Sequence, residues 1–170
     1  MSRVAILSDI HANLEALDAV LADVDALQLS EIACLGDFVG YGASPNECLD
    51  RLRPRLAVAV LGNHDAAALG LLRLGGFHND AATTARWTQQ HLEERHRGWL
   101  ESLPYSVLWR GLRLVHASPS GPEEWNYVLS VADADQAVSR SGDARGNRGA
   151  EVALAAIQMA RLRADAVARG

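Results

Sequence analysis

A chain of 170 residues, 49% of them hydrophobic, is long enough to bury a core and fits one globular domain. Its formal net charge of −5 argues against a nucleic-acid-binding surface, which is usually basic. No apolar stretch approaches the ~20 residues of a membrane span, and no signal peptide is recognised. The sequence therefore predicts a cytoplasmic protein without a membrane partner, whose Cys34 and Cys48 are buried free thiols rather than a disulfide.

Apolar runs alternate with amphipathic stretches in the N-terminal part of the sequence. Val4 to Leu7 reads as a buried strand, and leucine and valine recur at helical spacing from about Asn13 to Leu27. Two more strands are expected at Glu31 to Leu35 and at Ala57 to Leu61, with a helix between them that starts in a capping box at Ser44. This alternation is typical of a parallel sheet with helical crossovers.

The second part of the sequence predicts a different kind of structure. A long helix is expected from Asp80 to Arg97, followed by a hairpin whose strands are Tyr105 to Trp109 and Leu112 to His116. Residues 131–170 are rich in Ala and Arg, and we expect them to form a divergent tail, helical or partly disordered. Residues 1–130 are expected to form the functional domain.

Side chains that can bind metal follow three successive strands. Asp9 and His11 follow the first expected strand, Asp37 follows the second, and Asn63 and His64 follow the third. Ligands of open parallel sheets bind beyond the carboxyl ends of the strands, so all five side chains should project toward one rim. This set of oxygen and imidazole donors suits manganese, iron or zinc better than calcium. The sequence therefore predicts a transition-metal site.

His116, after the last expected strand, extends these clusters into a longer pattern. Asp-x-His, Gly-Asp, Gly-Asn-His-Asp and a single His occur in this order, and over roughly residues 3–131 they resemble the calcineurin-like metallophosphoesterase superfamily. Phe38 to Gly42, followed by Ser44-Pro45, further resembles its bacterial and archaeal branch of small phosphoesterases. The resemblance implies an α/β (α+β) fold, a sandwich of two sheets flanked by helices. It also implies two divalent ions, with Mn²⁺ expected and Fe, Zn or Ni as alternatives.

The resemblance assigns five residues to metal binding. Asp9 and His11 would hold the first ion, Asp37 would bridge both ions, and Asn63 and His116 would hold the second. The family pattern continues with Gly-His-x-His, but no His follows His116 in this sequence. Each ion would then lack one imidazole ligand, so weak or single-metal binding is expected.

Two neighbouring residues are implied in catalysis. His64 stands where the family protonates the leaving group or stabilises the transition state, and Asp65 would orient it. A hydroxide bridging the metal ions would attack phosphorus in line and hydrolyse a phosphomonoester or phosphodiester. The substrate would be a small-molecule phosphoester, such as a nucleotide or dinucleoside polyphosphate, or a phosphoprotein, and the sequence does not choose among them.

The missing motif leaves a second hypothesis open. The chain could be a truncated, catalytically inactive remnant that binds metal or phosphate weakly, or acts as an interaction module. We favour truncation or a frame shift over a purposeful replacement as the origin of the tail. A second sheet that ended at the hairpin would be incomplete and would expose an apolar edge, through which the chain could form homo-oligomers.

The remaining histidines and Trp125 are expected to have less specific roles. His91 and His96 lie in a charged stretch and are interpreted as solvated surface residues, and His78 as a loop residue rather than a substrate contact. Trp125 follows His116 closely in sequence, so packing and a role in the substrate pocket are equally open.

Overall fold

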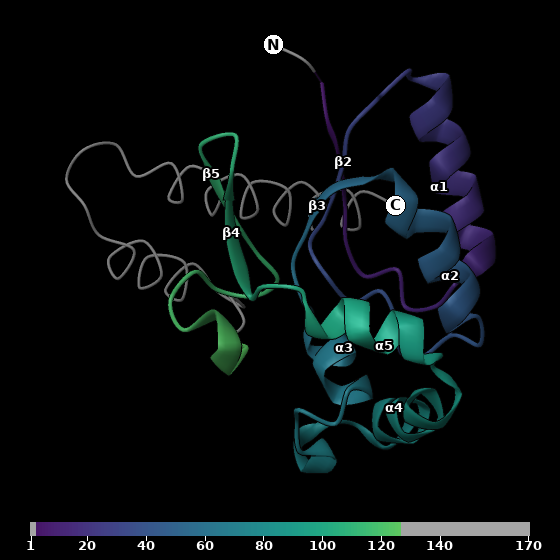
Figure 1. Cartoon of the computed structure of the whole chain (residues 1–170). Coiled ribbons are helices and arrows are strands. Elements are labelled where there is room, and N and C mark those ends of the chain that lie inside the picture. The colour runs from purple at the N-terminus through teal and green to yellow at the C-terminus, as the bar shows by residue number, and fades with distance from the viewer. Residues whose placement is uncertain (1–2, 127–170) are drawn as a thin grey trace, which may run out of the picture.

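A three-stranded parallel sheet forms the centre of the structure (Figure 1). The computed structural model describes residues 3–126; the predicted tail at 131–170 lies outside the described residues. The strands are β1 (Ala5–Leu7), β2 (Ile32–Cys34) and β3 (Leu56–Ala59), and they lie in the order β1-β2-β3. Both strand pairs are parallel, so the predicted sheet is confirmed, although each strand is shorter than expected.

Two helices cover one face of this sheet. They are α1 (Leu14–Ala26) and α2 (Pro45–Leu52), and the short η1 (Arg53–Arg55) leads from α2 into β3. The helical spacing of Leu17, Leu21 and Val24 explains α1, because these three side chains are the buried ones. Asn13 caps this helix by accepting a hydrogen bond from the Ala16 N–H at 3.0 Å.

The start of α2 differs from its prediction. Ser44 stands at the N-cap but its side chain makes no capping hydrogen bond, so the expected capping box is not formed. Pro45 occupies the first helical position, where its fixed φ suits the helix and its missing N–H costs nothing. The proline and the burial of Leu49 and Leu52 therefore start and hold this helix without the cap.

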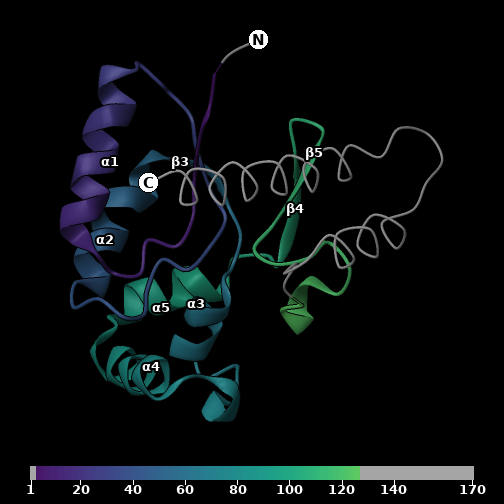
Figure 2. The ribbon, with the colours of Figure 1, turned by 180° about the vertical axis from the view of Figure 1, so that it is seen from behind.

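A β-hairpin packs on the other face of the sheet, as seen from behind in Figure 2. Its strands are β4 (Ser106–Trp109) and β5 (Leu112–Val115), which pair antiparallel. Neighbouring residues of a strand point to opposite faces: Ala33 joins the cluster under the hairpin, whereas Ile32 joins the main core under the helices. The predicted sandwich of two sheets flanked by helices is confirmed, and in the described part the second sheet has these two strands.

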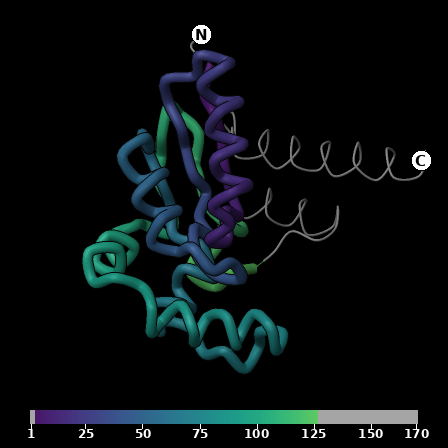
Figure 3. Tube along the Cα trace, turned by 90° about the vertical axis from the view of Figure 1, so that its right-hand side faces the viewer, coloured from purple at the N-terminus to yellow at the C-terminus, as the bar shows by residue number. Residues whose placement is uncertain are grey.

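Three further helices lie beyond the carboxyl ends of the parallel strands (Figures 1 and 3). They are α3 (Asn63–Ala68), α4 (Asn79–His91) and α5 (Glu94–Glu101). Two short turns, η2 (Leu74–Gly76) and η3 (Pro122–Glu124), complete the described elements. Of the described helices, none is long and apolar enough to cross a membrane.

The single long helix predicted from Asp80 to Arg97 is wrong. The chain becomes extended at Leu92, with ψ 123°, because this side chain turns into the core and is 7% exposed. Asn46 of α2 holds the break: its side chain accepts from the Glu93 N–H and donates to the His91 carbonyl, both at 2.9 Å. A tertiary contact therefore overrides the local helical pattern.

The break also places His96 in the interior. This residue is 1% exposed, which corrects its interpretation as a solvated surface residue, whereas His91 is exposed as expected. Cys34 and Cys48 are buried free thiols, as predicted.

Candidate metal centre

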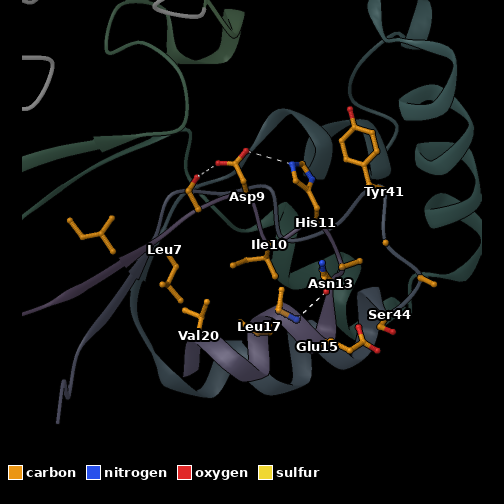
Figure 4. Close-up of a pocket in the computed structure, with 16 residues that line it drawn as sticks. Leu7, Asp9, Ile10, His11, Asn13, Glu15, Leu17, Val20, Tyr41 and Ser44 are labelled. Carbon is orange, nitrogen blue, oxygen red and sulfur yellow. Dashed lines mark hydrogen bonds and ion pairs between the residues drawn. The ribbon is translucent and has the colours of Figure 1, made fainter. Parts of the chain in front are cut away.

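Loops at the carboxyl ends of the parallel strands bring the predicted ligands together. Asp9 and His11 lie between β1 and α1, Asp37 follows β2, and α3 begins at Asn63 directly after β3. Figure 4 shows Asp9 and His11 side by side, with Tyr41 next to the His11 ring. The rim predicted from the strand ends is thus formed in the structure.

Three of these candidate ligands have a left-handed backbone conformation. The φ angles are 58° at Asp9, 50° at His11 and 57° at Asp37, in a region that non-glycine residues rarely adopt. Such a conformation costs on the order of 1–3 kcal/mol per residue and persists only where the surroundings enforce it. Here the Asp9 N–H donates to the Gly36 carbonyl at 3.1 Å, and the His11 N–H donates to the Asp37 carbonyl at 2.9 Å. Strain held in this way is typical of functional sites.

The Asp37 carboxylate lies at the centre of the cluster and is 2% exposed. One oxygen, Oδ1, accepts the His64 backbone N–H at 2.8 Å. The other, Oδ2, lies 3.4 Å from His116 Nε2 and 3.8 Å from His11 Nε2. This carboxylate therefore faces imidazoles on two sides.

Two sets of metal-ligand atoms result, and they share Asp37. One set is Asp9, Asp37 and His116, and the other is His11, Asp37 and His64; within each set the ligand atoms lie within 4.8 Å of one another. The sharing agrees with a bridging role for Asp37. His64 joins His11 in this arrangement, whereas the resemblance paired His11 with Asp9. Because Asp9 Oδ1 also lies 3.5 Å from His11 Nε2, the geometry accommodates both divisions of the ligands.

His116 and Asn63 lie side by side, as expected. The Asn63 Oδ1 is 3.0 Å from His116 Nε2, and His116 Nδ1 is 2.8 Å from the Leu35 carbonyl. A carbonyl partner fixes the proton on Nδ1, which leaves Nε2 as the nitrogen that could bind a metal ion. His11 is held in the same way, with Nδ1 at 3.3 Å from the Val39 carbonyl.

Charges in the cluster compensate one another. The hydrogen bond with His11 lowers the pKa of Asp9 to about 2, although burial opposes the shift. Burial lowers the pKa of His116, but the hydrogen bond and charge of Asp37 outweigh it and raise the pKa to about 9. The His116 imidazole thus holds a proton at a position where a cation would bind, and metal binding to such a ligand would release that proton.

Asp65 is fully buried and ties the loops of the site together. Its carboxylate accepts the backbone N–H groups of Asp37, Val39 and Gly62, at 2.8, 3.1 and 3.0 Å. Burial and the nearby Asp37 raise its pKa, while the three amide donors lower it. No hydrogen bond joins Asp65 to the His64 ring among the described residues. The expected orienting contact is therefore not formed, and Asp65 positions backbone instead.

Packing, rather than a hydrogen bond, holds the His64 ring. Its Nδ1 is buried and has no hydrogen-bond partner in the described structure. The ring centroid lies 4.8 Å from that of His11, 4.7 Å from Tyr41 and 5.2 Å from Phe77. A Cβ atom on Gly40 would lie 2.7 Å from Nδ1, so this close approach requires glycine. Burial lowers the pKa of His64.

Two clefts open at the centre. One has a volume of about 780 Å³ and follows β1 and α1 up to Asp9 and His11 (Figure 4). The other, of about 500 Å³, is lined by Asn63 and His64 together with residues of the loops that follow α3 and η3. Each cleft therefore reaches candidate ligands of the cluster.

Sequence reasoning missed several residues at the second cleft. They are Tyr41, Arg73 and Phe77. Trp125, for which packing and a pocket role were both left open, lines the cleft and also packs against the core. His78 also borders the cleft, in its exposed loop. Gly40 and Gly42 flank Tyr41 directly after Asp37, which was a usable signal; Arg73 and Phe77 carried none.

Comparison with known proteins assigns this arrangement to a family. The sequence profile of the calcineurin-like phosphoesterases matches residues 2–170. The chain belongs to the calcineurin-like phosphoesterase family. A curated relative, the protein MJ0912 of Methanocaldococcus jannaschii, is 41% identical over 132 residues, which are 75% of this chain and 54% of the relative.

Solved structures of this family resemble the described fold. A metallophosphoesterase from Sphaerobacter thermophilus is 42% identical, with a TM-score of 0.62 over 74% of this chain and 50% of that chain. A protein described as a candidate diadenosine tetraphosphatase is 26% identical, with a TM-score of 0.55 over 75% of this chain and 56% of that chain. The chain thus spans about half the length of the relatives that it matches.

Proposed function

We propose that the protein is a metal-dependent phosphoesterase that hydrolyses a phosphomonoester or phosphodiester. The observation that carries the proposal is the buried Asp37, shared by two sets of metal-ligand atoms at the carboxyl ends of the parallel strands. Membership of the calcineurin-like phosphoesterases supports the same chemistry. We propose Mn²⁺ as the working ion, with Fe, Zn or Ni as alternatives, because the donors are carboxylate, amide and imidazole groups.

The residues present fit divalent ions. Asp9, His11, Asp37, Asn63 and His116 would hold them. The His64 ring, whose buried Nδ1 has no hydrogen-bond partner among the described residues, supports the proposal as a further ligand. Bound ions would neutralise the phosphoryl oxygens and lower the pKa of an attacking water.

The chain's own residues would then bind and position the phosphoester. His64 lies between the ligand cluster and the second cleft, where a ring N–H can donate to a phosphoryl or leaving oxygen. The backbone around it is fixed by Asp37, which accepts the His64 N–H, and by Asp65, which accepts the Gly62 N–H. Asp65 would thus affect the reaction indirectly, by fixing the backbone that carries His64.

A second candidate function is an inactive remnant that binds metal or phosphate weakly. The observation in its favour is that, among the described residues, each set of ligand atoms contains three residues. Water would have to complete each coordination shell, and the affinity for metal would fall accordingly.

Manganese-dependent hydrolysis of bis(p-nitrophenyl) phosphate by the 170-residue protein separates the two candidates. Asp37→Asn keeps the shape of the side chain but removes its charge, and we expect it to abolish turnover. Asp18→Asn is the matched control, because Asp18 pairs with Arg51 at the surface away from the site. Equal background rates in the folded wild-type and Asp37→Asn proteins would favour the remnant.

A further inference from the structure

The cleft beside His64 contains features that phosphoester hydrolysis does not require. It includes Asn63 and His64 but neither Asp9 nor His11, and Tyr41 lines both this cleft and the β1 cleft. Its volume of about 500 Å³ lies in the range of small-molecule sites. A leaving group attached to the reacting phosphorus would enter this cleft past His64.

Three aromatic rings from three separate loops border the cleft. Tyr41 comes from the loop after β2, Phe77 follows η2, and Trp125 follows η3. Tyr41 and Phe77 both contact the His64 ring, and the Trp125 ring lies 6.1 Å from that of His116. Tyr41 is 49% exposed and Phe77 is half-buried, so their rings remain accessible to a ligand. Aromatic faces brought together in this way suit a flat, aromatic ligand.

Charged groups border the same cleft. Arg73 is exposed there and makes no hydrogen bond or ion pair with any described residue, in a chain whose net charge is −5. A guanidinium group binds phosphate through two parallel hydrogen bonds. Glu124 contributes a carboxylate that accepts from Asn126 at 2.8 Å and can accept further donors, such as an exocyclic amino group. A nucleotide suits all of these groups: its base can lie against the aromatic rings and donate to Glu124, and its phosphate can bind Arg73.

We propose that this cleft binds the base and a neighbouring phosphate of a nucleotide leaving group. The base would lie against Tyr41, Phe77 and Trp125, and Arg73 would hold a phosphate that does not react. The inference rests on the proposed function: the oxygen of water bonds to phosphorus, the bond from phosphorus to the leaving oxygen breaks, and that oxygen leaves on the nucleotide with a proton. A phosphotyrosine peptide would supply a ring but leave Arg73 without an anion beside that ring.

Equilibrium binding without added metal tests the cleft separately from the chemistry. By isothermal titration calorimetry of the full chain, we expect adenosine 5′-monophosphate to bind about tenfold or more tightly than ribose 5-phosphate, since a base that stacks on aromatic side chains adds to the affinity. Phe77→Ala should weaken binding of the nucleotide roughly tenfold and leave ribose 5-phosphate unchanged. Arg73→Gln should weaken both ligands.

Two control variants each remove an aromatic ring or a cation from α4, outside the cleft. Trp87→Ala deletes an aromatic ring that stacks on His91 of α4, and Arg86→Gln deletes an exposed cation of the same helix; neither should change binding. Phe77→Leu removes the ring but keeps an apolar side chain. If Phe77→Ala fails to fold, Phe77→Leu replaces it, and the same roughly tenfold weakening of nucleotide binding is expected.

Equal affinity for adenosine 5′-monophosphate and ribose 5-phosphate overturns the proposal that the cleft binds a nucleotide. An equal effect of Phe77→Leu on the affinity for both ligands also overturns it. Tighter binding of a phosphotyrosine peptide than of the nucleotide also overturns it, in favour of a protein substrate. The diester assay with Asp37→Asn reports on the proposed function alone, so failure of one proposal is distinguishable from failure of the other.

Discussion

Gly62 lies against Asp37 so closely that a Cβ atom on Gly62 would be 2.1 Å from Asp37 Oδ1. The same carboxylate oxygen accepts the His64 N–H at 2.8 Å, so the end of β3 and the loop after β2 meet at one atom. Real carbon atoms do not approach an oxygen this closely. The position of Asp37, the candidate ligand that both sets share, therefore depends on the absence of a side chain at residue 62.

Gly62→Ala should accordingly disrupt the centre. We expect it to lower the free energy of unfolding by roughly 2–4 kcal/mol, through overpacking in a buried site, and to remove metal binding by displacing Asp37. Gly98→Ala is the control, because a Cβ at Gly98 of α5 would meet nothing within 4 Å. That variant should be stabilised by about 0.5–1 kcal/mol. Urea unfolding of both variants checks the prediction, and a Gly62→Ala protein as stable as wild type would contradict it.

Asp65→Asn tests whether this residue positions backbone. An amide in place of the carboxylate presents one oxygen to the N–H groups of Asp37, Val39 and Gly62, and its NH₂ group faces donors. We expect a loss of roughly 2–4 kcal/mol in the free energy of unfolding, because buried donors are left unpaired. Asp23→Asn, on the exposed face of α1, should change stability by less than about 0.5 kcal/mol. A stable Asp65→Asn protein that loses only activity would instead support a direct catalytic role.

The parallel strands and the placement of the candidate ligands were predictable because each depends on a local pattern. The apolar runs before Asp9, Asp37 and Asn63 specify strands, and parallel strands necessarily bring their carboxyl ends to one edge. The hairpin was also predictable, since Arg110 and Gly111 both adopt positive φ in the turn, as a tight hairpin requires. In these places, local sequence and tertiary structure agree.

The errors arose where tertiary contacts decide the structure. Nothing near Leu92 in sequence indicates that Asn46, far away in α2, will bind both sides of a helix break there. The burial of His96 follows from that break. The second cleft was missed for a similar reason: Arg73 and Phe77, at the two ends of η2, border the cleft only because the folded chain places this segment beside His64.

His96 should make stability depend on pH. Burial lowers its pKa below the ordinary 6.5, with a further contribution from Arg95, and opposed by Asp50 and Glu93. Its Nε2 lies 3.2 Å from Asp50 Oδ1, but neither ring nitrogen makes a hydrogen bond within the described residues. The unfolded chain therefore takes up the proton first. The stabilisation is present above pH 6.5 and declines as the pH falls from 6.5 toward the lower pKa of the folded state.

Replacing His96 by Gln should flatten this part of the pH profile. The measurement is the free energy of unfolding of wild type, His96→Gln and the exposed control His91→Gln at pH 7.5 and 5.5. We expect the difference between the two pH values to shrink only in His96→Gln. If the difference in the free energy of unfolding between the two pH values is unchanged in His96→Gln, the pKa of His96 is not lowered in the folded state.

His116→Gln should weaken the binding of Mn²⁺ without unfolding the protein. Gln can still donate to the Leu35 carbonyl, which His116 Nδ1 contacts at 2.8 Å, but it does not supply an imidazole beside Asp37. With one imidazole removed from a set of three ligand residues, we expect the affinity for Mn²⁺ to fall at least about tenfold, more than is typical for loss of an outer partner. Calorimetric titration of Mn²⁺ measures this, with His91→Gln as the control because His91 lies exposed at the end of α4. Equal affinities in the two variants would exclude His116 as a ligand and leave Asp9 and Asp37 without the imidazole that completes their set.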